Sequence, residues 1–209
     1  MKNQASIFEK HYEFYLRQIK DISLEEIADH LGVDFIKNEM ILSFFGNTYR
    51  IRQEGILDRY RNRPLYAICI VLFKYILTSP KTIYFESPWT SYKDFKDAGP
   101  LISFFSNDVE NAIVNHFSGK TRDLKKACEN LGGKMADIDI FYDVSMQVIA
   151  LPKIPMLLLF NDTDEEFPAQ CSVLFKKNIE NYLDMESVAI MGNIFSKMLI
   201  ATDKGELYE

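Results

Sequence analysis

The stretch Met146–Phe160, MQVIALPKIPMLLLF, decides the fold class. It contains two short apolar runs, MQVIAL and IPMLLLF, which are separated by Pro152 and Lys153, and Pro155 lies near the start of the second run. Short apolar runs bounded by turn residues are typical of buried β-strands. Another candidate strand, IDIFYDV at residues 138–144, comes directly before them. Three strands in quick succession, joined by short turns, predict a largely antiparallel arrangement.

Apolar spacing along the rest of the chain predicts helices and strands in separate runs. Helices are predicted at residues 5–20, 23–32, 64–78, 107–117, 120–131, 172–183 and 185–200. Strands are predicted on either side of a turn at Gly46-Asn47 and at residues 82–87. This order favours an α+β fold, with a mixed or mostly antiparallel sheet of about five to six strands packed with helices. We expect a single domain over residues 1–209, with the helical N-terminal segment 1–32 packed on it.

The segment Ile22–Val33, ISLEEIADHLGV, is similar to the first half of a helix-turn-helix module. Its helix begins at a capping box formed by Ser23 and Glu26 and stops at Gly32. A recognition helix would have to begin within about four residues of that turn, but the sequence that follows is rich in strand-forming side chains. The net charge of −6 also disfavours a nucleic-acid partner. We therefore expect no nucleic-acid binding.

Composition points to a protein without a membrane partner. No apolar run approaches the roughly 20 residues that a membrane-spanning helix requires, and the first residues lack the pattern of a secretory signal. A cytoplasmic location is the expectation. The three cysteines, Cys69, Cys128 and Cys171, are odd in number and widely separated, so they form neither a disulfide framework nor a metal knuckle. No cofactor is evident, and the oligomeric state is left open.

Arginine is concentrated in one part of the chain. Five of the seven arginines lie between Arg50 and Arg63. Arg59, Arg61 and Arg63 alternate with other residues, so in an extended segment their guanidinium groups would project from one side. That geometry suits bidentate capture of phosphate or carboxylate. The alternative is that these arginines solvate a surface loop.

A group of carboxylates, Asp162, Asp164, Glu165 and Glu166, follows the apolar run that ends at Phe160. Carboxylates at the end of a buried strand can ligate Mg²⁺ or Ca²⁺. The spacing lacks the glycine and the distal glutamate of a calcium-binding loop. The alternative is a solvated strand exit, whose polar residues turn the chain back into water.

The chain's only tryptophan opens a third candidate site. Trp89 is followed by Ser91, Tyr92 and Lys93, and the ring could line a ligand pocket by stacking while Tyr92 and Lys93 supply polar contacts. The alternative is a half-buried tryptophan that only packs at an edge. We expect this segment to be irregular or a short helical connection.

Read together, several segments resemble an uncharacterised prokaryotic family known as domain of unknown function 3786. The strings that carry the resemblance are FFGNTYRIRQEG (44–55), PLYAICIVLFKYIL (64–77), SPWTSYKDF (87–95), LGGKMADID (131–139) and EEFPAQCSVLFKKNIENYLDMESVAIMGNIFSKML (165–199). The resemblance covers nearly the whole chain. It implies a setting in anaerobic or redox-linked metabolism, and some members carry a cysteine-rich iron–sulfur segment, which the three cysteines of this chain cannot supply.

The resemblance favours the loop at Trp89 and the loop that ends at Pro168 over the arginines as ligand-binding candidates. The candidate ligand-binding residues are Trp89, Ser91, Tyr92, Lys93, Glu166, Phe167 and Pro168. A pocket between these loops would take a small molecule or a partner protein, and the leading hypothesis is a non-enzymatic ligand-binding or accessory domain. One alternative is a Mg²⁺-dependent hydrolase or transferase with Asp162, Asp164 and Glu165 as metal ligands. Another is an anion-binding module built on Arg59, Arg61 and Arg63.

Overall fold

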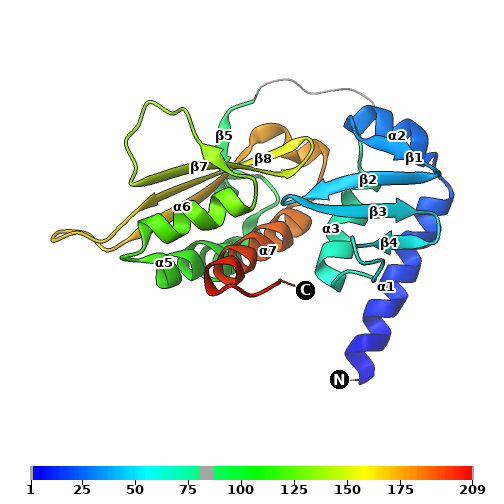
Figure 1. Cartoon of the computed structure of the whole chain (residues 1–209), viewed down its shortest axis with the longest axis horizontal. Coiled ribbons are helices and arrows are strands. Elements are labelled where there is room, and N and C mark those ends of the chain that lie inside the picture. Colours follow the sequence, from blue (N-terminus) through cyan, green and yellow to red (C-terminus); the bar gives the residue numbers. More distant parts are fainter. Residues whose placement is uncertain (1, 81–86, 209) are drawn as a thin grey trace.

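The computed structural model describes residues 2–80 and 87–208 and confirms the α+β class, with all strands in two antiparallel sheets (Figure 1). The first sheet has the order β1-β2-β3-β4, with β1 at Asp34–Ile36, β2 at Glu39–Phe44, β3 at Asn47–Arg52 and β4 at Gly55–Leu57. The second has the order β5-β9-β8-β7-β6, with β5 at Trp89–Ser91, β6 at Lys134–Met135, β7 at Val144–Leu151, β8 at Ile154–Asn161 and β9 at Gln170–Lys176.

The last helix, α7 (Met185–Lys204), lies in the middle of the molecule and contacts α3 (Tyr66–Leu77), α5 (Asn111–Phe117) and α6 (Thr121–Asn130) (Figure 1). The α-helices are α1 at Lys2–Lys20, α2 at Leu24–Leu31, α3 at Tyr66–Leu77, α4 at Ile102–Phe105, α5 at Asn111–Phe117, α6 at Thr121–Asn130 and α7 at Met185–Lys204. A π-helical turn at Ser106–Glu110 joins α4 to α5. Across the described part of the chain, no helix has both the length and the apolar character needed to cross a bilayer.

The tip of the β2–β3 hairpin joins the two sheets. Phe45 and Gly46 form the turn with φ angles of 46° and 75°, which is the left-handed region that glycine accepts and phenylalanine rarely adopts. The Phe45 ring is fully buried and stacks on Phe195 of α7 at 5.3 Å between ring centroids. Its N–H donates to the carbonyl of Ala150 in β7 over 2.9 Å. Burial of the ring therefore holds the turn in its uncommon conformation.

The N-terminal helices pack against the first sheet and α3. Tyr12, Leu16 and Ile19 of α1 are buried, and the Tyr12 hydroxyl accepts a hydrogen bond from the Ile56 N–H of β4 over 3.1 Å. The Ser23 half of the predicted capping box is confirmed, because Ser23 Oγ accepts from the Glu26 N–H over 3.3 Å. After α2 the chain enters β1 and not a second helix, which agrees with the rejection of a helix-turn-helix module.

The hairpin at Gly46, the central helix α3 and the last helix α7 were predicted correctly. Two other predictions were wrong. Residues 138–143 form an irregular loop in which Phe141 is 87% exposed, because β6 at Lys134–Met135 takes the pairing position beside β7. Residues 172–176 are part of β9 and not of a helix, and the 3₁₀ turn Lys177–Asn181 follows them.

Pairing with β8, the preceding strand, explains the second error. In β9 the side chains of Val173 and Phe175 are buried while their neighbours are more exposed, which is the two-residue period of a strand. The predicted connection at Trp89 is a short strand, β5, followed by a 3₁₀ turn at Tyr92–Asp94. The strand predicted at 82–87 lies almost entirely outside the described residues.

Candidate functional site

A tight turn at residues 58–62 divides the arginine cluster. Asp58 Oδ1 accepts hydrogen bonds from the Tyr60 and Asn62 N–H groups, both over 2.8 Å, and the Asp58 N–H donates to the Asn62 carbonyl over 2.8 Å. Arg61 sits in the left-handed region at φ 66°. Because the segment is folded and not extended, Arg61 borders a different concavity from Arg59 and Arg63.

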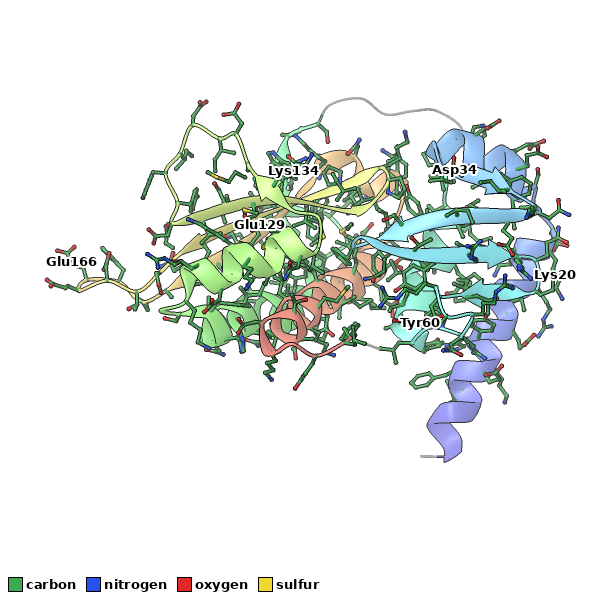
Figure 2. The ribbon with its side chains drawn as sticks, in the orientation of Figure 1. Lys20, Asp34, Tyr60, Glu129, Lys134 and Glu166 are labelled. Atoms are coloured by element: carbon green, nitrogen blue, oxygen red, sulfur yellow. The ribbon has the colours of Figure 1, made fainter. Side chains whose placement is uncertain are left out.

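The larger concavity, which we call the hairpin cleft, has a volume of about 530 Å³. Three parts of the chain enclose it: the β2–β3 hairpin, the 58–68 segment that leads into α3, and the ends of α6 and α7. Figure 2 labels Tyr60 on this side of the molecule. The lining residues are Phe45, Gly46, Asn47, Thr48, Tyr49, Asp58, Arg59, Tyr60, Asn62, Arg63, Pro64, Leu65, Ile68, Asn130, Leu131, Met198, Thr202, Glu206, Leu207 and Tyr208.

The two arginines of the hairpin cleft differ in their ion-pair contacts. Arg63 pairs with Glu9 over 2.9 Å, and its guanidinium lies 3.5 Å from the centroid of the Tyr12 ring. Arg59 lies over the Tyr60 ring at 4.6 Å and has no ion-pair partner among the described side chains of residues 7–80 and 87–208. Arg59 is therefore the cation that this cleft can offer to a ligand.

Tyrosine hydroxyls supply further polar groups to the cleft. Burial, with a smaller contribution from Asp58, raises the pKa of Tyr49 to about 12. Burial also raises the pKa of Tyr208. Both hydroxyls therefore stay protonated at neutral pH and can donate hydrogen bonds. The cleft combines apolar rings, neutral donors and one uncommitted guanidinium.

The smaller concavity, which we call the basic basin, has a volume of about 490 Å³ and lies against the first sheet. Its floor is Glu39, which is 7% exposed and accepts hydrogen bonds from Arg50 and Arg52 of the neighbouring strand. The Arg50–Glu39 distance is 2.8 Å. The lining residues are Lys37, Asn38, Glu39, Arg50, Arg52, Glu54 and Arg61.

In the Trp89 loop, residues 89–93, Trp89 and Tyr92 pack against other parts of the protein. Tyr92 is buried, stacks on Phe105 at 4.3 Å and donates its hydroxyl to the Met185 carbonyl over 2.8 Å. Trp89 is half-buried at the sheet edge, beneath the ammonium of Lys176 at 4.3 Å. Ser91 ends β5 and Lys93 is exposed.

The aspartates of the acidic loop, residues 162–168, accept hydrogen bonds from backbone amides. Asp162 accepts from the Gly119 N–H over 2.8 Å, and Asp164 Oδ1 accepts from the N–H groups of Glu166 and Phe167 over 2.8 and 2.7 Å. The hydrogen bond from the Phe167 amide, followed by the one from Glu166, lowers the pKa of Asp164. Glu165, Glu166 and Phe167 are exposed at the tip, where Figure 2 labels Glu166. No group of three His, Cys, Asp or Glu side chains in the described chain is placed to hold a metal.

The structure does not bring the Trp89 loop and the acidic loop together. Asn161 at the start of the acidic loop pairs with Gln170, and Trp89 pairs with Lys176, so the loops lie at opposite ends of β9. A strand of that length separates them by about 20 Å. A single pocket lined by both is therefore not formed, and Pro168 lies with the acidic loop.

Sequence reasoning missed most of the hairpin cleft. It identified Arg59 and Arg63, but Tyr49, Thr202 and Tyr208 come from segments far apart in the chain. The alternation in NTYRIR could have shown that Tyr49 faces inward while Arg50 and Arg52 face outward. Nothing in the local sequence pairs the residues after Thr202 with the hairpin.

Fold and site together define a two-sheet α+β protein with a ligand-sized cleft between the β2–β3 hairpin and the ends of α6 and α7. The chain belongs to the family described as Domain of unknown function (DUF3786), which matches residues 23–198. This confirms the resemblance. Among curated proteins there is no match, and among solved structures there is none either.

Proposed function

We propose that this protein is a non-enzymatic binding domain that holds a small anionic molecule with a planar group in the hairpin cleft. The observation that carries the proposal is the position of Arg59, an arginine with no ion-pair partner in the described chain, beside the Tyr60 ring in a cavity of about 530 Å³. A guanidinium binds a carboxylate or phosphate through two parallel hydrogen bonds. The neighbouring ring offers a stacking surface.

The size and composition of the cleft support this proposal. Small-molecule sites typically have volumes of about 300–1,000 Å³ and combine apolar walls with a few polar groups. The apolar wall here includes Phe45 and Ile68, which are buried and belong to the core. Tyr49 and Tyr208 supply neutral donors. Such a lining selects a ligand by shape and hydrogen bonding as well as by charge.

The enzyme alternative has less support in the acidic loop. Asp162 and Asp164 accept hydrogen bonds from backbone amides, and no group of three His, Cys, Asp or Glu side chains in the described chain is placed to hold a metal. Glu165 and Glu166 accept no backbone hydrogen bond within the part of the chain that the structure describes. The proposal therefore keeps the accessory role in anaerobic or cofactor-linked metabolism that the resemblance implies. It also keeps a cytoplasmic location, which agrees with three cysteines that are all free thiols.

The proposal is tested by thermal-shift screening with nucleoside monophosphates and aromatic carboxylates, followed by calorimetry on the compounds that stabilise the protein. We expect Arg59→Met to weaken binding of such a compound about tenfold or more, because one charge-assisted contact is lost. Tyr60→Ala is expected to weaken it by a smaller factor. Arg122→Met is the matched control, since Arg122 is an exposed arginine of α6 that lines neither concavity.

Two results would contradict the proposal. One is a compound that binds with equal affinity to the wild type and to Arg59→Met. The other is the absence of any stabilising compound in both classes, together with native mass spectra that show only the 24.3 kDa chain after gentle anaerobic purification.

A further inference from the structure

The basic basin is built on the outward face of the first sheet. Met40 pairs with Ile51, which places Glu39 opposite Arg52 and diagonal to Arg50. Side chains alternate between the two faces of a strand, so Arg50 and Arg52 share a face while Ile51 points into the core. Both arginines contact the nearly buried Glu39 carboxylate. This pairing holds their guanidinium groups beside the Glu39 floor of the basin.

Two further cations stand at the rim of the basin without ion-pair partners in the part of the chain that the structure describes. Lys37 belongs to the β1–β2 turn, and Arg61 belongs to the 58–62 turn. With Glu39 and Glu54 as the only carboxylates among its lining residues, the basin contains four cations and two anions. Its excess positive charge comes from Lys37 and Arg61.

The backbone places these two cations in conformations that cost free energy. Lys37, Asn38 and Arg61 have φ angles of 54°, 62° and 66°. Of the four non-glycine residues with positive φ in the described chain, these three line the basin, and the fourth is the buried Phe45. Glycine or asparagine would adopt this region at lower cost. The sequence instead has long cationic side chains at two of the three positions.

We infer that the basic basin is a binding site for a multiply charged oxyanion, either inorganic phosphate or the phosphate group of a larger metabolite. Lys37 and Arg61 close on the anion from opposite turns, and the exposed parts of Arg50 and Arg52 face it from the sheet. Arginine forks match the geometry of phosphate oxygens, and a lysine adds a compact charge. This site is separate from the hairpin cleft and does not depend on the function proposed for that cleft.

Calorimetry at low ionic strength tests the inference with three probes: inorganic phosphate, pyrophosphate and glycerol 3-phosphate. We expect saturable binding that weakens as salt is added, because the rim cations are exposed and screened. Tighter binding of glycerol 3-phosphate than of phosphate identifies an ester as the ligand. Tighter binding of phosphate or pyrophosphate identifies the inorganic ion.

The variants Arg61→Gly and Lys37→Gly separate binding from folding. Each removes a cation while supplying the residue that the backbone conformation favours, so the melting temperature is expected to stay the same or rise. Each is expected to weaken binding of the preferred probe about tenfold. Arg122→Met is the control and should bind like the wild type.

The inference is overturned if none of the three probes binds to the wild type. It is also overturned if Arg61→Gly and Lys37→Gly are folded and bind the probe as tightly as the wild type does. Neither result bears on the hairpin cleft, which is tested with Arg59→Met and different compounds.

Discussion

The hairpin cleft and the basic basin share the 58–62 turn but are held together by different forces. The cleft depends on buried rings, since Phe45 stacks on Phe195 and Tyr49 is 6% exposed. The basin depends on ion pairs to Glu39 and on left-handed backbone at Lys37 and Arg61. One concavity is therefore a product of packing and the other a product of electrostatics and turn geometry. They should respond differently to truncation, pH and salt.

The largest expected effect is the loss of the buried ring that forms the cleft wall. Phe45→Ala should lower the free energy of unfolding by about 3–4 kcal/mol, because truncating a buried phenylalanine removes apolar contacts and leaves a cavity. Urea denaturation measures this change. The control Phe14→Ala, at a side chain that is 57% exposed, should change stability by less than about 0.5 kcal/mol. A loss below about 1 kcal/mol for Phe45→Ala would contradict the packing account of the cleft.

The second expected effect is a pH dependence of stability that comes from Tyr49 in the hairpin cleft. The pKa of Tyr49 is raised to about 12 in the folded protein. The stabilisation that comes from keeping this phenol protonated is therefore fully present below the unfolded-state pKa of about 10 and is lost as pH rises through 12. The wild type should lose up to about 2 kcal/mol more than Tyr49→Phe over that interval. Chemical denaturation at several pH values measures the difference, and parallel pH profiles for the two proteins would show that Tyr49 ionises freely.

The third expected effect concerns the floor of the basin. Glu39→Gln keeps the shape of the side chain but removes the charge that Arg50 and Arg52 share, so the unfolding free energy should fall by about 1 kcal/mol at low salt. The loss should shrink partly in about 1 M salt, because the two guanidinium groups are partly exposed although Glu39 is nearly buried. The loss for Phe45→Ala should not shrink in this way. If both losses respond equally to salt, the contrast between the two regions is wrong.

The smallest expected effect concerns backbone strain at the rim of the basin. Arg61→Gly and Arg61→Ala both remove the guanidinium, but only alanine keeps the left-handed conformation costly. Arg61→Gly should therefore be more stable than Arg61→Ala by about 1 kcal/mol and close to the wild type. Thermal denaturation of the three proteins measures the order. Equal stability of the two variants would indicate that the turn does not hold residue 61 at positive φ.

Much of the first sheet could be predicted from the sequence because its signals are local. NTYRIR alternates apolar and charged side chains with the period of a strand, and Gly46 marks the hairpin beside it. The expected one-sided projection of Arg59, Arg61 and Arg63 was not found. Asp58 accepts two backbone hydrogen bonds that fold the segment into a turn, and alternation alone carries no sign of that contact.

The second sheet was harder to predict because its local signal is ambiguous, and the cleft was harder because its contacts are distant in the chain. SVLFK at residues 172–176 has the composition of either a helix or a strand, and its pairing with β8 decides for the strand. The cleft needs Tyr208 to meet a hairpin at residues 45–49, and no local pattern encodes such an encounter. The separation of the Trp89 loop from the acidic loop follows from the register of β9 and could not be read from either loop.

The strand order of the two sheets has a consequence for the order of folding. In the first sheet each strand pairs with the next one along the chain, whereas β5 must find β9, with Trp89 opposite Lys176. Sheets made of neighbouring strands have low contact order and form quickly, while distant pairings must first overcome a larger loop-closure entropy. We expect the basin to assemble early in folding. The cleft is completed only when the Phe45 tip docks on the slower sheet.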